Sequence, residues 1–168
     1  MGRQVWPNNL AKEKNARIIL PEIHDKRIQE AASELTSLGF QVVCNSDFQD
    51  HTDIYLDYIS KLPFTDNWPT DNLRKYLKDP LHFAMSMVGC GDADGVIAGA
   101  VTSSSDVIRT AIRIVGIHPA SNWVSSIFFL ISPSCDHAYT FADCAVIPEP
   151  DGRQLAVIGS DSAEFHYL

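Results

Sequence analysis

The chain has 168 residues, of which 45% are hydrophobic, and its formal net charge is −8 at pH 7. An acidic chain without a run of basic residues is a poor binder of nucleic acid and of anionic membrane surfaces. The apolar runs are too short to span a bilayer. We therefore expect a globular protein of one domain or parts of two, with neither nucleic acid nor a membrane as its partner.

The cysteines and histidines give no metal-binding pattern. Cysteines stand at positions 44, 90, 135 and 144 without CxxC spacing, and the six histidines show neither HxxxH nor HExxH. We therefore predict no metal site. The N-terminus lacks the apolar core of a signal peptide, so reduced thiols and a cytoplasmic location are expected.

The first forty-four residues predict a βαβ unit. Residues 1–15 are polar and predict a flexible N-terminus. A short apolar run over 16–20 predicts a buried strand, the apolar spacing over 24–39 predicts a helix, and FQVVC at 40–44 predicts a second strand. Strand, helix and strand over about thirty residues form a unit that crosses over right-handed into a parallel sheet.

The middle of the chain continues this pattern. Residues 53–62 predict a short helix, and LPFTDNWPT, with two prolines, predicts a loop. Asp79 and Pro80 predict the N-cap and first position of a further helix. A third strand is expected over 93–100, and Ser105 or Asp106 is expected to cap the helix that follows.

The pattern changes after Pro119. Residues 123–132 and 138–147 predict a hairpin, and 153–168 predict a helix on which the chain stops in mid-pattern. We therefore predict an incomplete first α/β domain over 16–119 and the start of a truncated second α/β domain over 120–168.

The stretch GVIAGAVTSSSDVIR at 95–109 predicts an anion site. The N-terminus of a helix leaves backbone N–H groups unpaired and carries partial positive charge. Ser103, Ser104 and Ser105 add hydroxyl donors, and Arg109 can bind phosphate with its guanidinium fork. The alternative stays open that the loop is an ordinary connection, with a capping residue and a solvated arginine.

Several segments, in this order, resemble one family, the phosphate acetyl/butyryl transferases (phosphotransacetylases). Each segment alone is a weak signal, whereas their combined order is specific. They are Leu20-Pro21-Glu22 followed by Asp25-Lys26-Arg27, Gly91 to Gly95 before a strand, Gly99-Ala100 followed by Ser103 to Arg109, and Phe141-Ala142-Asp143.

The resemblance implies a three-layer, parallel-sheet fold like that of the isocitrate/isopropylmalate dehydrogenases, with an active cleft between two domains. It implies the reaction acetyl-CoA + phosphate = acetyl phosphate + CoA, with coenzyme A as a substrate and no bound cofactor. Ser103, Ser104, Ser105 and Arg109 would bind phosphate or acyl phosphate. Glu22 and Asp143 would face the cleft.

The chain also departs from the family pattern. The family proteins are longer and carry a C-terminal Ser-Arg pair and an aspartate that this sequence lacks, and their segment corresponding to 44–53 is longer. We therefore expect no normal turnover by this chain alone, unless a homodimer or a second chain completes the site. Two alternatives stay open: a non-catalytic module that binds phosphate, acyl phosphate or coenzyme A, and a gene remnant.

Overall fold

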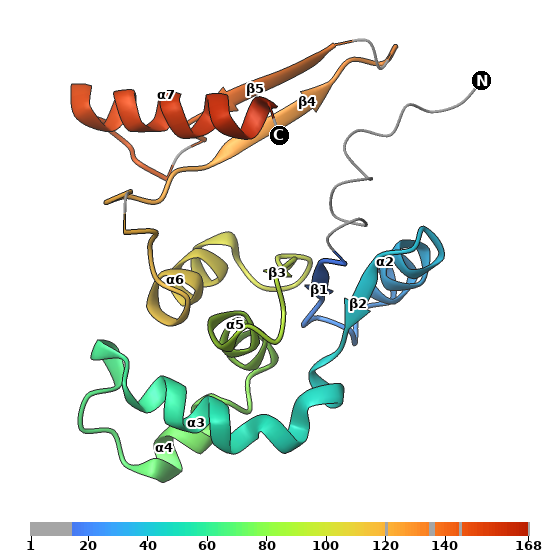
Figure 1. Ribbon diagram of the computed structural model, residues 1–168, viewed down its shortest axis with the longest axis vertical. Helices are drawn as coiled ribbons and strands as arrows, with labels where there is room; N and C mark the ends of the chain where they lie inside the picture. The colour runs from blue at the N-terminus through green and yellow to red at the C-terminus, as the bar shows by residue number, and fades with distance from the viewer. Residues whose placement is uncertain (1–14, 120, 135–136, 145, 168) are drawn as a thin grey trace. The chain divides into compact units, whose positions relative to one another are not determined.

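The computed structural model describes residues 15–119, 121–134, 137–144 and 146–167 (Figure 1). Apart from Asn15, the predicted flexible N-terminus lies outside the described residues, and so does Cys135. The described chain forms two compact units, 15–116 and 117–167, which are taken separately below. The predicted incompleteness of the two domains stays a prediction.

The first unit contains a parallel sheet in the order β2-β1-β3. Ile18 in the central strand pairs with Val42 on one side and with Gly95 on the other. The strands are β1 (Arg17–Ile19), β2 (Gln41–Val43) and β3 (Gly95–Val96), and the helix α2 (Lys26–Ser37) connects the first two. The structure therefore confirms an α/β fold with a parallel sheet, although β3 is much shorter than the predicted strand at 93–100.

Beyond α2, three further helices of this unit, at 52–60, 80–90 and 104–114, agree with the sequence patterns. The predicted short helix is present as α3, and Asp79 caps α5 as expected, since its carboxylate accepts a hydrogen bond of 2.8 Å from the N–H of Leu81. No pattern predicted α4 or the two 3-10 turns. The segments are η1 (Asn45–His51), α3 (Thr52–Ser60), η2 (Pro63–Thr65), α4 (Thr70–Tyr76), α5 (Pro80–Cys90) and α6 (Ser104–Ile114).

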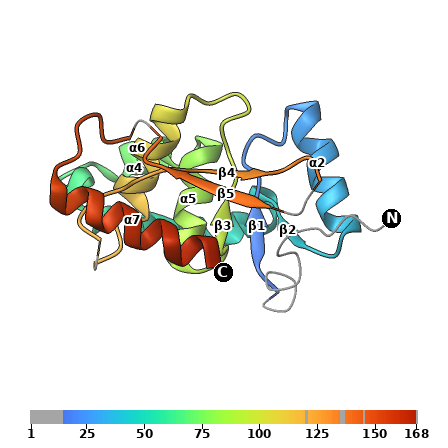
Figure 2. The same cartoon turned by 90° about the horizontal axis from the view of Figure 1, so that it is seen from above.

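Helix α5 forms the centre of this unit. It lies between α3 and α6 and contacts both (Figure 1), while α2 lies beside β2 and α5 beside β3 (Figure 2). A helix that is apolar on nearly all sides has to be buried. In α5, six of the seven positions from 81 to 87 are buried, the exception being His82. The buried positions are Leu81, Phe83, Ala84, Met85, Ser86 and Met87.

A polar cluster joins α3 to the turn before β3. The Asp92 carboxylate accepts a hydrogen bond of 2.6 Å from the Tyr55 hydroxyl and lies 2.9 Å from Nδ1 of His51. Burial and this hydrogen bond raise the pKa of Tyr55, so the phenol stays protonated and keeps donating. The cluster therefore fixes the chain just before it enters the sheet.

The second unit consists of two antiparallel strands and one helix. Phe128 pairs with Phe141 across β4 (Ile127–Ile131) and β5 (Ala138–Ala142). The helix α7 (Gly152–Tyr167) packs against this hairpin, where the Phe165 ring meets Phe129 at 5.8 Å between centroids.

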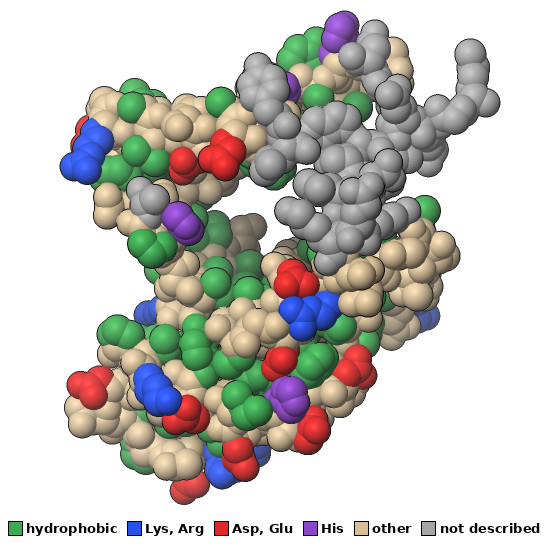
Figure 3. All heavy atoms as spheres, in the orientation of Figure 1, with side chains coloured by type: hydrophobic (Ala, Val, Ile, Leu, Met, Phe, Trp, Pro, Cys, Tyr) green, Lys and Arg blue, Asp and Glu red, His purple; other side chains and the backbone are tan. Residues whose placement is uncertain are grey.

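The charged side chains are dispersed on the face shown in Figure 3. Over α3 and α4, acidic and basic side chains alternate with hydrophobic ones, and the basic side chains do not gather into a patch on that face. Within the described part of the chain, none of the helices combines the length and the apolar character that crossing a membrane requires.

We predict that Gly89→Ala destabilises the first unit. A Cβ at Gly89 would lie 2.5 Å from Cζ of Tyr58, whose hydroxyl donates to the carbonyl of Ile114 at 2.6 Å. The ring cannot move away without losing that hydrogen bond, and such overpacking costs about 1–3 kcal/mol. Thermal unfolding should show the loss. Gly95→Ala is the control, because its Cβ would meet no atom within 4 Å; equal stability of the two variants would contradict the prediction.

Candidate functional site

The candidate site lies where the strand order reverses. Because β1 is central, the chain passes from β1 to β2 on one side and later enters β3 on the other. Open α/β sheets bind ligands at the carboxyl ends of strands beside such a reversal. Glu22 follows β1, and the loop of residues 97–103 follows β3, so both lie at this edge.

The Glu22 carboxylate holds the loop after β3. It accepts four backbone hydrogen bonds, from Gly99 at 3.0 Å, Ala100 at 2.7 Å, Val101 at 3.1 Å and Thr102 at 2.7 Å. Four successive N–H groups thus converge on one internal anion. The sequence analysis predicted a site in this stretch, but the loop amides already bind a carboxylate of the chain.

Two further features fix the same loop. Gly99 has φ of +110°, a conformation in which other residues would be strained. Arg27 donates to the carbonyl of Ala100 at 2.9 Å and to the carboxylate of Asp25 at 2.7 Å. Both of the first two family segments therefore contact the Gly-Ala segment directly. Glu22 of Leu-Pro-Glu binds its N–H groups, and Arg27 of Asp-x-Arg binds one of its carbonyls.

The environment of Glu22 favours its charged form. Burial raises its pKa, but the hydrogen bonds from Thr102, Ala100 and Val101 outweigh burial and lower the pKa from 4.5 to about 2. A carboxylate that accepts several backbone N–H bonds shows this behaviour in general. Glu22 is therefore a fixed negative charge at neutral pH.

Helix α6 begins directly after the loop of residues 97–103. Its N-cap is Ser103, whose hydroxyl accepts a hydrogen bond of 3.2 Å from the N–H of Asp106. The predicted cap at Ser105 or Asp106 is therefore wrong, because the loop held by Glu22 ends at Thr102 and starts the helix earlier. Ser104 and Ser105 instead occupy the exposed first turn.

Asp106 engages two of the predicted phosphate ligands. Nη1 of Arg109 lies 2.7 Å from Oδ1 of Asp106, and the Ser103 hydroxyl donates to Oδ2 at 2.7 Å. Both side chains of the Arg109–Asp106 pair are more than half exposed. The structure thus brings Ser103, Ser105 and Arg109 to one end of α6, and an anion bound there has to share or replace Asp106.

Asp143 lies in the second unit, directly after β5. Its carboxylate accepts hydrogen bonds from the N–H and hydroxyl of Ser126, both at 2.8 Å, and from the N–H groups of Val146 at 3.0 Å and Ile147 at 2.6 Å. Burial raises its pKa, and these bonds lower it below the ordinary value. Asp143 therefore fixes its own loop, and its role in a cleft stays a prediction.

The two acidic residues before β3 have structural partners. Asp94 accepts from the backbone N–H of Arg17 at 2.7 Å, and Asp92 belongs to the cluster with Tyr55 described above. Among the described residues, no group of three or more His, Cys, Asp or Glu side chains could hold a metal ion.

The sequence analysis did not predict that Arg27 would fix the loop after β3 or that Asp106 would pair with Arg109. The Asp-x-Arg pattern singled out Arg27 without giving it a role, and a contact 73 residues away has no local signal. Asp106 had a signal, since an acid three residues before an arginine on a helix predicts an ion pair.

The chain matches one known family over most of its length. The sequence profile of the family described as phosphate acetyl/butaryl transferase matches residues 34–167. The phosphate acetyltransferase of Acetivibrio thermocellus is 29% identical to this chain. The alignment covers 94% of this chain and 56% of that protein. That of Thermoanaerobacterium thermosaccharolyticum is 31% identical, with 55% of its length and 91% of this chain covered.

Solved structures agree with these matches. A phosphotransacetylase from Staphylococcus aureus superposes with a TM-score of 0.79 at 26% identity, over 92% of this chain and 53% of that one. A phosphotransacetylase from Streptococcus pyogenes, at 24% identity, has the same fold with a TM-score of 0.74. The chain thus spans about half the length of the curated relatives it matches.

We predict that Glu22→Gln destabilises the first unit by about 2 kcal/mol, because an amide cannot accept four N–H bonds and loses the charge that strengthens them. The folded pKa lies below the ordinary value of 4.5, so the carboxylate stabilises the fold fully above about pH 4.5, and this stabilisation is lost as the pH falls towards 2. Melting temperatures of the wild type and variant should therefore converge in acid.

Glu30→Gln is the matched control for this prediction. Glu30 is an exposed residue on α2, and its replacement removes the same charge. Its melting temperature should stay close to that of the wild type at every pH. A Glu22→Gln deficit that is as large near pH 2 as at neutral pH would refute the assignment to the carboxylate charge.

Proposed function

We propose that this chain, which belongs to the phosphate acetyl/butaryl transferase family, binds inorganic phosphate or an acyl phosphate at the N-terminal end of α6. One observation carries the proposal: Ser103, Ser105 and Arg109 meet at the start of a helix, at the carboxyl edge of a parallel sheet. There the partial positive charge of the helix, these two serines and a guanidinium favour an anion together, and Ser104 lies in the same exposed turn.

The anion binds to α6 rather than to the loop before it. Hydrogen bonds to a charged group contribute about 1.5–3 kcal/mol each, and Glu22 accepts four from the loop. An exposed ion pair contributes only about 0.2–1 kcal/mol, so phosphate displaces Asp106 from Arg109 far more easily than it displaces Glu22.

The reaction proposed for the site is acyl transfer between coenzyme A and phosphate. The thiolate of coenzyme A attacks the carbonyl carbon of an acyl phosphate, a C–S bond forms, and the C–O bond to phosphate breaks. The N–H groups and hydroxyls at the start of α6, with Arg109, would bind the phosphate that leaves and stabilise its charge. Coenzyme A is a substrate in this scheme.

The wider assignments rest on the family. They are a fold like that of the isocitrate/isopropylmalate dehydrogenases with two α/β domains, coenzyme A and acetyl phosphate as substrates, a cytoplasmic location, and a homodimer or second chain that completes the site. Because the chain spans only about half of its relatives, the second candidate is a module that binds phosphate without catalysing the transfer.

We predict that Arg109→Ala weakens phosphate binding at least about tenfold, since the loss of one charge-assisted hydrogen bond corresponds to about 1.4 kcal/mol or more. Calorimetric titration with phosphate and with acetyl phosphate measures this. Arg113→Ala is the control: Arg113 lies one turn further along α6, over the Phe64 ring at 5.8 Å, and its loss should leave the affinity unchanged. Equal affinities of the two variants, or no binding by the wild type, would disprove the site.

We predict that a coupled assay separates the two candidate functions. The purified chain receives acetyl phosphate and coenzyme A, and formation of the thioester is followed by its absorbance beside a thermal melt. Turnover above the rate without protein that Arg109→Ala abolishes supports the transferase. A cooperative melt that phosphate raises, without turnover, supports the binding module. Turnover that Arg109→Ala leaves intact would contradict both.

A further inference from the structure

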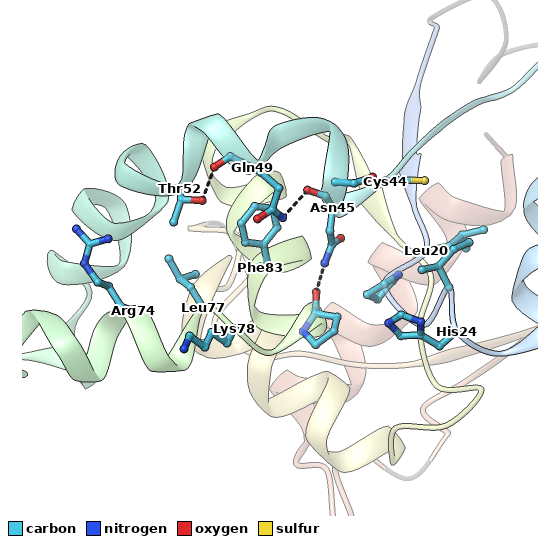
Figure 4. Close-up of a pocket in the computed structure, with 14 residues that line it drawn as sticks. Leu20, His24, Cys44, Asn45, Gln49, Thr52, Arg74, Leu77, Lys78 and Phe83 are labelled. Carbon is cyan, nitrogen blue, oxygen red and sulfur yellow. Dashed lines mark hydrogen bonds between the residues drawn. The ribbon is translucent and has the colours of Figure 1, made fainter.

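A second feature at the carboxyl edge of the sheet has no role in the site on α6. It is a cavity of about 580 Å³ outside the ends of β1 and β2, bounded by the segment after β1, by η1 and by α4 (Figure 4). None of the residues 97–109 lines it. Its volume is in the range that holds small-molecule ligands in proteins.

The inner wall of the cavity is apolar. Leu20, Leu77 and Phe83 line it, and each of them is no more than 4% exposed. Pro21 is also buried and lies on the same wall. This wall can therefore pack against the hydrocarbon part of a ligand.

The opposite wall is polar and held by its own hydrogen bonds. Asn45 donates to the carbonyl of Pro80 at 3.0 Å, Gln49 donates to the carbonyl of Asn45 at 3.0 Å, and Thr52 donates to the carbonyl of Gln49 at 2.6 Å (Figure 4). Oδ1 of Asn45 is buried and has no hydrogen-bond partner among the described residues. A buried acceptor without a partner is unfavourable, but this oxygen is closed off from solvent, so the polar surface of the wall comes from the other atoms of these side chains.

The charge of the lining is opposite to that of the chain. Arg74 and Lys78 come from α4 and the turn after it, and His24 lies on the other side of the cavity (Figure 4). None of the described residues that line the cavity is acidic, although the chain carries a net charge of −8. Arg74 forms an ion pair with Asp53, in which Nη2 lies 3.4 Å from Oδ1. Both side chains are more than half exposed, so this ion pair is weak.

We propose that this cavity binds an amphipathic organic anion. Its carboxylate or phosphate head group would lie at the end of the cavity that carries Arg74 and Lys78 (Figure 4). Its apolar body would cover Leu20 and Phe83. The proposal goes beyond phosphate binding on α6, because the two features share no lining residue and an apolar wall favours a ligand with a hydrocarbon part.

Three probe molecules that share an unbranched octyl-type hydrocarbon chain and differ in the head group test the ligand class. Calorimetric titrations use octanoate, octyl phosphate and 1-octanol, which carry a carboxylate, a phosphate and no charge. We expect saturable binding of at least one anion, and binding of octanol weaker by about tenfold or more. The tighter of the two anions identifies the head group. No saturable binding of either anion at millimolar concentration, or equal binding of octanol, would overturn the proposal.

Two double variants with equal changes in charge test the location. In Arg74→Ala/Lys78→Ala the affinity for the preferred anion should fall about tenfold or more. The control is Lys61→Ala/Lys75→Ala: Lys75 lies on α4 and Lys61 just after α3, and neither lines the cavity. Its affinity should match that of the wild type. All four residues are exposed, so both variants should fold. An equal loss of affinity in both would mean attraction to the overall charge rather than binding in the cavity.

Discussion

The first unit depends on one carboxylate and the four amides that it binds. Glu22 lies at the end of β1, and its partners lie 77 to 80 residues later, at Gly99 to Thr102. Without Glu22, four neighbouring N–H groups, two of them exposed and two partly buried, would bind water in place of a charged acceptor that brings them together. Glu22 therefore determines the path of the loop, and Arg27 fixes it from the other side through the carbonyl of Ala100.

The path of this loop decides which groups remain for a ligand. The amides of Gly99 to Thr102 bind Glu22 and are therefore not available to a ligand. The first turn of α6, which follows directly, is the next place where a helix leaves N–H groups without an intrahelical partner. The negative charge of Glu22 is compensated by its four hydrogen bonds, whereas Arg109 pairs with an exposed aspartate. The weaker of these two arrangements is the one at which we propose that an external anion binds. The proposed site would thus combine a loop fixed by Glu22 with an exposed ion pair that an anion can replace.

The sequence predicted those parts of the fold that local chemistry determines. Asp79 followed by Pro80 located the start of α5, and the apolar spacing after Arg17–Ile19 located α2. Helix α4 was missed because it is seven residues long, follows a proline and buries only Leu73, so it shows no apolar stripe. The cap of α6 was misplaced because three serines and an aspartate are all good caps. The choice among them depends on Glu22, a contact that no local pattern contains.

The segment between β2 and α3 links the fold to the cavity. In this chain, only the 3-10 turn η1 lies between β2 and α3, and η1 supplies the polar wall of the cavity. Pro21 lines the cavity, and Glu22, the next residue, holds the loop that leads to α6. Two adjacent residues thus face two different features, because the backbone after β1 lies between the ends of β2 and β3.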